Sequence, residues 1–131
     1  MVIVVGYYPA APGQAALTRA IEEVRHRGGR LVVVNSSRGD ASVDPRYAQG
    51  GDVEQLRATL QASGVEWHLE QPVHGRDAAD EILAVAESVR ADLIVIGMRH
   101  RTPVGKLVLG STAQRVLLDA RCPVLSVKAL D

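Results

Sequence analysis

The sequence predicts an α/β fold, a five-stranded parallel open sheet with strand order 3-2-1-4-5 and helices on both faces. Short aliphatic runs alternate along the chain with segments whose apolar residues recur at helical spacing. Hydrophobic residues make up 47% of the chain but aromatic residues only 3%, as is common in helix-covered parallel sheets. At 131 residues the chain is expected to form a single domain, residues 1–131, because it is too short for two ordinary ones.

The first part of the chain predicts a strand, a helix and a second strand. Residues 2–5 form a continuous apolar run, which suits a central strand buried on both faces. After an irregular stretch at residues 6–13, apolar residues at i, i+3, i+4 and i+7 from Leu17 indicate a helix that ends at Gly28. Residues 31–34 are the second buried strand, which a right-handed crossover places parallel to the first.

The middle of the chain predicts a long loop, a helix, an edge strand and another helix. Residues 35–51 lack periodicity and are interpreted either as a lid or as a simple insertion. Residues 53–60 carry apolar positions at helical spacing. Residues 65–69 alternate between apolar and polar, which indicates an edge strand with one solvated face, with Trp67 packed in the core. Residues 77–89 form a helix whose acidic first turn fits the helix dipole.

The last part predicts a strand at residues 93–96, a charged loop, a helix at 111–120 and a fifth strand at 124–127. In open parallel sheets of this Rossmann-like kind, ligands bind beyond the carboxyl ends of the strands, where the strand order reverses. For the order 3-2-1-4-5 that point lies between the first and fourth strands. The loops that leave these strands, residues 6–13 and 97–110, are therefore the predicted site.

The second of these loops has the features of an anion site. Ser111 and Gln114 match the S-x-x-Q form of a capping box, so the N–H groups after Gly110 are expected to point outward from a helix N-terminus. Such a terminus attracts anions, and cationic side chains nearby suit phosphate oxygens. His100 is interpreted either as a phosphate ligand or as a solvated loop tip. The cationic residues of the loop are Arg99, Arg101 and Lys106.

A family resemblance rests on the same residues. Gly97 is followed thirteen positions later (110 − 97 = 13) by Gly110-Ser111, then by a helix and the strand-like PVLSVK. This pattern resembles the universal stress protein family, whose nucleotide-binding members carry G-x2-G-x9-G-[S/T]. MVIVVG, AALTRAIEEVRHRGGRLVVVN and DLIVIG are similar to other family segments, so the resemblance covers nearly the whole chain. The sequence differs at His100, where the family has glycine, and at Tyr8, where an acidic residue is common.

The resemblance implies a small cytoplasmic stress-response regulatory protein that binds an adenine nucleotide, ATP or AMP, at the loop after the fourth strand. The phosphates would lie over that loop and adenine near the ends of the first two strands, where the ring of Tyr8 would either stack on the base or block it. The predicted phosphate-binding residues are Gly97, Met98, Arg99, His100, Arg101, Gly110, Ser111 and Thr112. The predicted adenine or ribose side consists of Tyr7, Tyr8, Val34 and Asn35.

Two alternatives to nucleotide binding by a regulator remain. The first is a member that binds no nucleotide and acts through dimerisation and contacts with other proteins. The second, a phosphotransfer enzyme or ATPase, is weaker because no carboxylates for Mg²⁺ and no water-positioning residue can be named in the loop. We therefore expect no enzymatic turnover beyond very slow ATP hydrolysis, and no catalytic residues.

Composition excludes several other classes. Lys plus Arg and Asp plus Glu both number 15, so no global charge favours a nucleic acid or an anionic membrane. Cys122 is the only cysteine, which excludes an internal disulfide, and we interpret it as a small buried hydrophobic residue. His26, His68 and His74 are too scattered to suggest a metal site. No apolar run reaches the ~18 residues of a membrane span, and no signal peptide is evident, so the protein is expected in the cytoplasm.

A homodimer is the predicted assembly. The fifth strand lies at the open edge of the predicted sheet, where unpaired N–H and C=O groups must be covered or disrupted. Pro123 only precedes this strand and Lys128 only follows it. Pairing with the same strand of a second copy would satisfy the edge, and the family resemblance implies the same contact. The predicted dimer residues are Val124, Leu125, Ser126 and Val127.

Overall fold

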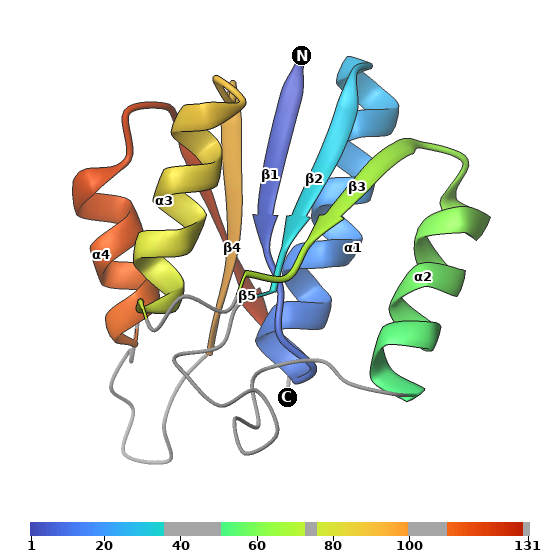
Figure 1. The fold of residues 1–131 in the computed structure, drawn as a ribbon, viewed down its shortest axis with the longest axis horizontal. Coiled ribbons are helices and arrows are strands. Elements are labelled where there is room, and N and C mark those ends of the chain that lie inside the picture. The colour runs from blue at the N-terminus through green and yellow to red at the C-terminus, as the bar shows by residue number, and fades with distance from the viewer. Residues whose placement is uncertain (36–50, 73–75, 100–109, 130–131) are drawn as a thin grey trace.

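The computed structural model describes residues 1–35, 51–72, 76–99 and 110–129. Strands and helices alternate through this part of the chain (Figure 1). The elements are β1 (Val2–Gly6), α1 (Ala11–Arg27), β2 (Arg30–Val34), α2 (Gly51–Ser63), β3 (Glu66–Glu70), α3 (Ala78–Ser88), β4 (Leu93–Arg99), α4 (Ser111–Asp119) and β5 (Val124–Ala129). The strands are parallel and lie in the order β3-β2-β1-β4-β5, which confirms the predicted fold class and strand order.

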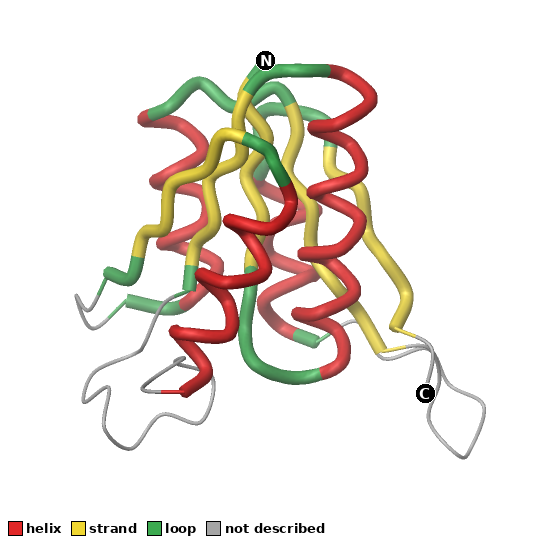
Figure 2. Tube along the Cα trace, turned by 90° about the vertical axis from the view of Figure 1, so that its right-hand side faces the viewer, coloured by secondary structure: helices red, strands yellow, loops and turns green. Residues whose placement is uncertain are grey.

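Helices cover both faces of the sheet. α1 and α2 lie on one face, and α3 and α4 lie on the other (Figures 1 and 2). Each helix connects two parallel strands, so it must run back along the sheet from the carboxyl ends of the strands to their amino ends. Among the described residues, no helix is both long enough and apolar enough to cross a membrane.

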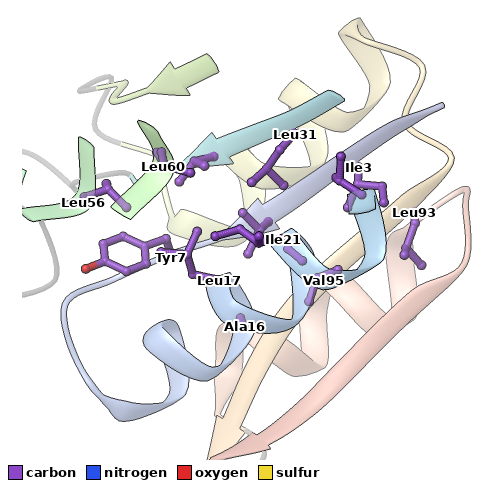
Figure 3. Packing of buried hydrophobic residues seen from close by; sticks show 14 residues of the cluster. Ile3, Tyr7, Ala16, Leu17, Ile21, Leu31, Leu56, Leu60, Leu93 and Val95 are labelled. Atoms are coloured by element: carbon purple, nitrogen blue, oxygen red, sulfur yellow. The ribbon is translucent and has the colours of Figure 1, made fainter. Parts of the chain in front are cut away.

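Successive residues of the central strands point into two separate aliphatic cores. Ile3 and Val5 pack in the core beneath α1 and α2, whereas Val4 packs in the core beneath α3 and α4. Figure 3 shows the first core, in which side chains from β1, β2 and β4 meet those of α1 and α2. Because these strands are buried on both faces, their sequences are continuous apolar runs rather than alternating ones. Burial of each such side chain stabilises the fold by about 1.5 to 3 kcal/mol.

β3 and β5 form the two edges of the sheet. On β3, Trp67 packs against the first core, and the guanidinium carbon of Arg57 lies 5.8 Å from the centre of its ring. The adjacent strand residues Glu66 and His68 are exposed. The prediction of an edge strand with one solvated face and a core Trp67 is therefore confirmed.

Two element boundaries differ from the prediction in ways that matter for the site. β4 continues to Arg99, three residues beyond 96, because its last residues pair with β5 through Gly97↔Val127, Met98↔Lys128 and Arg99↔Ala129. α1 begins at Ala11, inside the stretch predicted as irregular, because proline is tolerated in the first turn of a helix, where its missing N–H has no intrahelical acceptor.

Candidate functional site

The candidate site lies at the carboxyl edge of the sheet, where β1 and β4 meet. β1 pairs with β2 on one side and with β4 on the other. The chain leaves β1 for α1 on one face and leaves β4 for α4 on the opposite face, so the strand order reverses here, as predicted. In Figure 1 the carboxyl ends of the strands and the first turns of the helices lie along this lower edge.

Gly97 is a strand residue that packs against α1, whereas the sequence predicted it as the start of the loop after the fourth strand. A Cβ atom at Gly97 would lie 1.9 Å from the carbonyl oxygen of Pro12 in the first turn of α1. Met98, also predicted for the loop, has a buried side chain whose Sδ accepts a hydrogen bond of 2.9 Å from the Ser126 hydroxyl. The loop prediction was wrong at both positions, because pairing with β5 extends the strand.

The start of α4 is exposed and has a backbone conformation that requires glycine. Gly110 is the N-cap, with φ 80° and ψ 153°, and a Cβ there would meet no atom within 4 Å. Its carbonyl accepts a hydrogen bond of 3.1 Å from the N–H of Gln114. Ser111 is therefore the first helical residue. The predicted capping box is wrong, because Gly110 occupies the cap position.

The helix terminus nevertheless has the properties that were predicted for an anion site. The first N–H groups of an α-helix have no intrahelical acceptor, and the helix dipole places positive potential at this end. In this chain those N–H groups belong to Ser111, Thr112 and Ala113, and Ser111 is exposed. The hydroxyls of Ser111 and Thr112 add further polar groups at the same end.

Most of the predicted cationic loop is not part of the described structure. His100, Arg101 and Lys106 lie outside the described residues, and Arg99 is described only through its backbone, which pairs with Ala129 at the end of β4. Their predicted contacts with phosphate remain predictions.

The two tyrosines after β1 have different environments. Tyr7 is 5% exposed and its ring packs in the first core (Figure 3). Its hydroxyl accepts a hydrogen bond of 3.0 Å from Gln14 Nε2. Burial, and then the negative charge of Asp52, raises the pKa of the Tyr7 hydroxyl. Tyr8 is partly exposed, and its carbonyl accepts a hydrogen bond of 2.8 Å from the N–H of Ala10. Of the two tyrosines, only Tyr8 is therefore partly exposed at this edge.

Asn35, directly after β2, forms hydrogen bonds with residues at the ends of β1 and β3. Its side chain is fully buried; Nδ2 donates to the carbonyl of Tyr7 at 2.9 Å and Oδ1 accepts from Gln71 Nε2 at 3.1 Å. Its N–H donates to the carbonyl of Glu70, and the carbonyl of Val34 accepts from the N–H of Tyr7, both at 2.9 Å. These groups, predicted to face adenine or ribose, thus stabilise the edge itself. The sequence signal was a lone polar residue directly after a buried strand.

Sequence reasoning missed an ion pair between Arg76 and Glu81 at the same edge. Glu81 lies in the first turn of α3 and only 2% of its side chain is exposed. Arg76 donates to both of its carboxylate oxygens, from Nε at 2.8 Å and from Nη2 at 3.2 Å. The acidic first turn was visible in the sequence, but nothing there distinguished the buried Glu81 from the exposed carboxylates around it.

The cysteine lies away from this edge, and the described residues form no cluster of metal-binding side chains. Cys122 is half-buried, and burial raises the pKa of its thiol, which favours the unreactive thiol form. It lines a cavity of about 220 Å³ at the opposite edge of the sheet, together with Ile94 and Arg90. In the part of the chain that the structure describes, no three His, Cys, Asp or Glu side chains are grouped to hold a metal ion.

Comparison with known proteins places this geometry in a family. The model of the universal stress protein family matches residues 1–128 of the chain. A universal stress protein from Mycolicibacterium smegmatis is 52% identical over 126 residues, which cover 96% of both chains. A second relative, a universal stress protein from Thermus aquaticus, is 34% identical over 134 residues, covering 96% of this chain and 97% of its own.

Solved structures are similar over almost the full length. A universal stress protein from Archaeoglobus fulgidus has a TM-score of 0.76 and 34% sequence identity, with 98% of each chain covered. The universal stress protein of the same organism in complex with dAMP has a TM-score of 0.69 and 30% identity, again with 98% of each chain covered.

Proposed function

This chain belongs to the universal stress protein family, and from that premise we propose that it binds an adenine nucleotide at the carboxyl edge of its sheet. The observation that carries the proposal is the complex of a 30% identical relative with dAMP, which is similar to this chain over 98% of both. The switch point between β1 and β4 and the exposed start of α4 provide a site of the chemistry that such a ligand needs.

In the proposed complex the phosphate accepts hydrogen bonds at the start of α4, where Gly110 leaves the helix N-terminus open. The base lies towards the end of β1, beside the partly exposed residue Tyr8. Stacking of an aromatic side chain on a base is worth about 1 to 3 kcal/mol, so Tyr8 would compensate for the absence of an acidic residue at this position. The buried Asn35 holds the strand ends that form the floor of the site.

We propose that this site serves binding and regulation in a stress response rather than catalytic turnover. A bound nucleotide would stabilise the folded protein by RT ln(1 + [L]/Kd), so its concentration would be read out as a change in the population of the ligand-bound form. The described residues at this edge provide hydrogen-bond donors for a phosphate but no pair of groups that would activate water.

The experiment is calorimetric titration of the purified protein with AMP and ATP, using Gly110→Val and Gly64→Val as matched variants. Both glycines have positive φ, 80° and 78°, and at neither would a Cβ meet an atom within 4 Å. Each substitution should cost about 1 to 3 kcal/mol of stability through backbone strain. Only Gly110→Val should abolish binding, because its side chain occupies space at the start of α4. Equal binding by both variants would contradict the proposed site.

A homodimer through β5 is the second part of the proposal, and a difference between the two sheet edges favours it. The edge strand β3 exposes Glu66 and His68, and a charged side chain such as Glu66 discourages pairing with another strand. The edge strand β5 instead presents the partly buried aliphatic residues Val124, Leu125 and Val127. An antiparallel pair of β5 strands about a two-fold axis would satisfy the edge in both copies.

The exposed residues of α4 extend the same surface. Arg115 contacts Asp80 of α3 at 2.7 Å, so this side of α4 faces its helical neighbour. Leu117 follows two residues later and therefore points about 200° around the helix, towards the β5 edge. It is 41% exposed, and the adjacent Leu118 is 75% exposed. Leu117 would lose this exposed apolar area in a dimer built on β5.

A further inference from the structure

We propose that Arg76 is a phosphate-recognition residue of the nucleotide site, held in place by the buried carboxylate of Glu81, and that it makes the protein prefer phosphorylated adenine nucleotides over adenosine. This inference rests on the proposed nucleotide-binding function. It assigns the cationic group of the site to a residue before α3, outside the loop that follows β4.

The ion pair uses only some of the N–H donors of Arg76. Glu81 accepts two N–H groups of the guanidinium, at 2.8 Å and 3.2 Å, and is itself 2% exposed. A guanidinium carries five N–H donors, so three remain for another acceptor. The Arg76 side chain is 50% exposed, and Glu81 is its only ion-pair partner among the described residues. The fork to Glu81 fixes the plane of the group and directs its remaining donors outward.

The position of the pair places it at the same edge of the sheet as the proposed phosphate site. Ile82, the residue after Glu81, contacts the end of β1, since a Cβ at Gly6 would lie 2.7 Å from Ile82 Cδ1 and 3.7 Å from Ile96 Cγ2 of β4. The first turn of α3 therefore lies over the junction of β1 and β4. The 2.7 Å ion pair between Asp80 and Arg115 joins the same turn to α4. Figure 1 shows the starts of α3 and α4 at the same edge.

Stability alone is a poor explanation for this arrangement. Glu81 is removed from water at a cost that offsets much of its attraction to Arg76, and Arg76 remains 50% exposed, so the pair contributes little net stability. What such a pair does provide is a fixed orientation. An arginine with a fixed plane loses less conformational entropy when it binds a phosphate, and its planar fork matches phosphate oxygens.

Adenosine and AMP share the base and the ribose and differ only in the phosphate. Comparing the two ligands therefore distinguishes a role of Arg76 in phosphate recognition from a purely structural role. We would titrate both ligands into the wild-type protein, Arg76→Gln, Glu81→Gln, and Arg121→Gln as a control. Arg121 has an 86% exposed side chain and lies at the opposite edge of the sheet, where it contacts Glu87 at 3.5 Å. Circular dichroism and thermal melts would establish that each variant is folded.

Arg76→Gln should weaken AMP binding by roughly 10-fold or more, the loss expected for one hydrogen bond to a charged group, and should leave adenosine binding within about 2-fold of wild type. Glu81→Gln should cause a smaller loss for AMP alone, because its neutral amide holds the guanidinium less firmly. Arg121→Gln should bind both ligands like the wild type. If Arg76→Gln does not fold, Arg76→Lys, which keeps the charge beside Glu81 but not the fork, should fold and still lose part of the AMP preference.

AMP binding by folded Arg76→Gln at wild-type affinity would overturn the inference and leave the proposed function standing. Equal losses for AMP and adenosine would also overturn it, since a residue that merely supports the fold of the site affects both. A wild-type protein that binds neither ligand would overturn the proposed function and this inference together.

Discussion

Replacing Gly97 with Ala should destabilise the fold strongly even when no ligand is present. The new Cβ would lie 1.9 Å from the Pro12 carbonyl oxygen, whereas real Cβ atoms essentially never approach another heavy atom within 3.0 Å. The first turn of α1 must therefore move away from β4 by at least about 1.1 Å. A gap of this size forfeits a quarter to a half of the dispersion energy between the surfaces that separate.

The expected loss is at the upper end of the usual cost of overpacking, about 3 kcal/mol, because the obstructing atom belongs to a helix backbone and not to a flexible side chain. For a chain of 131 residues, this corresponds to a melting temperature lower by about 10 °C. Gly28→Ala is the comparison for backbone strain alone: its φ is 80° and its ψ 178°, but a Cβ there meets no atom within 4 Å, so it should lose about 1 to 3 kcal/mol without any clash.

Urea unfolding followed by circular dichroism measures both changes. A Gly97→Ala protein as stable as the wild type would refute the conclusion that Gly97 is a packing glycine.

The remaining predictions concern the strand ends and the edge of the sheet. Asn35→Ala should cost about 1 to 3 kcal/mol in urea unfolding, because the Tyr7 carbonyl and the Gln71 amide lose a buried partner; an unchanged midpoint would count against the network. Because burial raises the pKa of Tyr7, its contribution to stability is present below the unfolded pKa of about 10 and is lost as the pH rises through the folded value, so Tyr7→Phe should remove from an absorbance titration one tyrosine that ionises above the ordinary pKa of about 10; loss of a tyrosine that ionises at or below that value would contradict this. In light scattering, Ser126→Pro should convert a dimer into a monomer, because Ile94 N–H bonds the Pro123 carbonyl, and by alternation the Ser126 N–H points away from β4; a monomeric wild type at micromolar concentration would contradict the dimer.

The fold could be predicted from the sequence because the order of apolar and polar residues indicates which segments are buried. Continuous aliphatic runs marked β1, β2 and β4 as strands buried on both faces, and the alternation around Trp67 marked β3 as an edge. The strand order 3-2-1-4-5 was predicted as an arrangement typical of doubly wound α/β sheets. The boundary of β4 was missed because Gly97 and Met98 do not continue the aliphatic run, and only their pairing with β5 reveals them as strand residues.

The candidate site was less predictable because proximity there depends on tertiary contacts. A serine followed by glutamine three residues later is a reasonable cap, but the choice between Ser111 and Gly110 depends on a backbone conformation that only glycine adopts readily. The pair Arg76 and Glu81 was missed because burial of Glu81 depends on how α3 sits on the sheet. Tyr7 is buried and Tyr8 is partly exposed because successive side chains alternate in direction after β1. Two adjacent tyrosines in the sequence do not show which of them is buried.

The most direct measurement of the central claim is an AMP titration followed through the backbone amide resonances of the ¹⁵N-labelled protein. We predict saturable shifts for Thr112 and Ala113 at the start of α4 and for Tyr8 after β1, with one dissociation constant for all three. The amides of Arg90 and Cys122, at the opposite edge of the sheet, should not move. No saturable shifts up to millimolar AMP, or shifts confined to the edge around Cys122, would contradict nucleotide binding at the carboxyl edge.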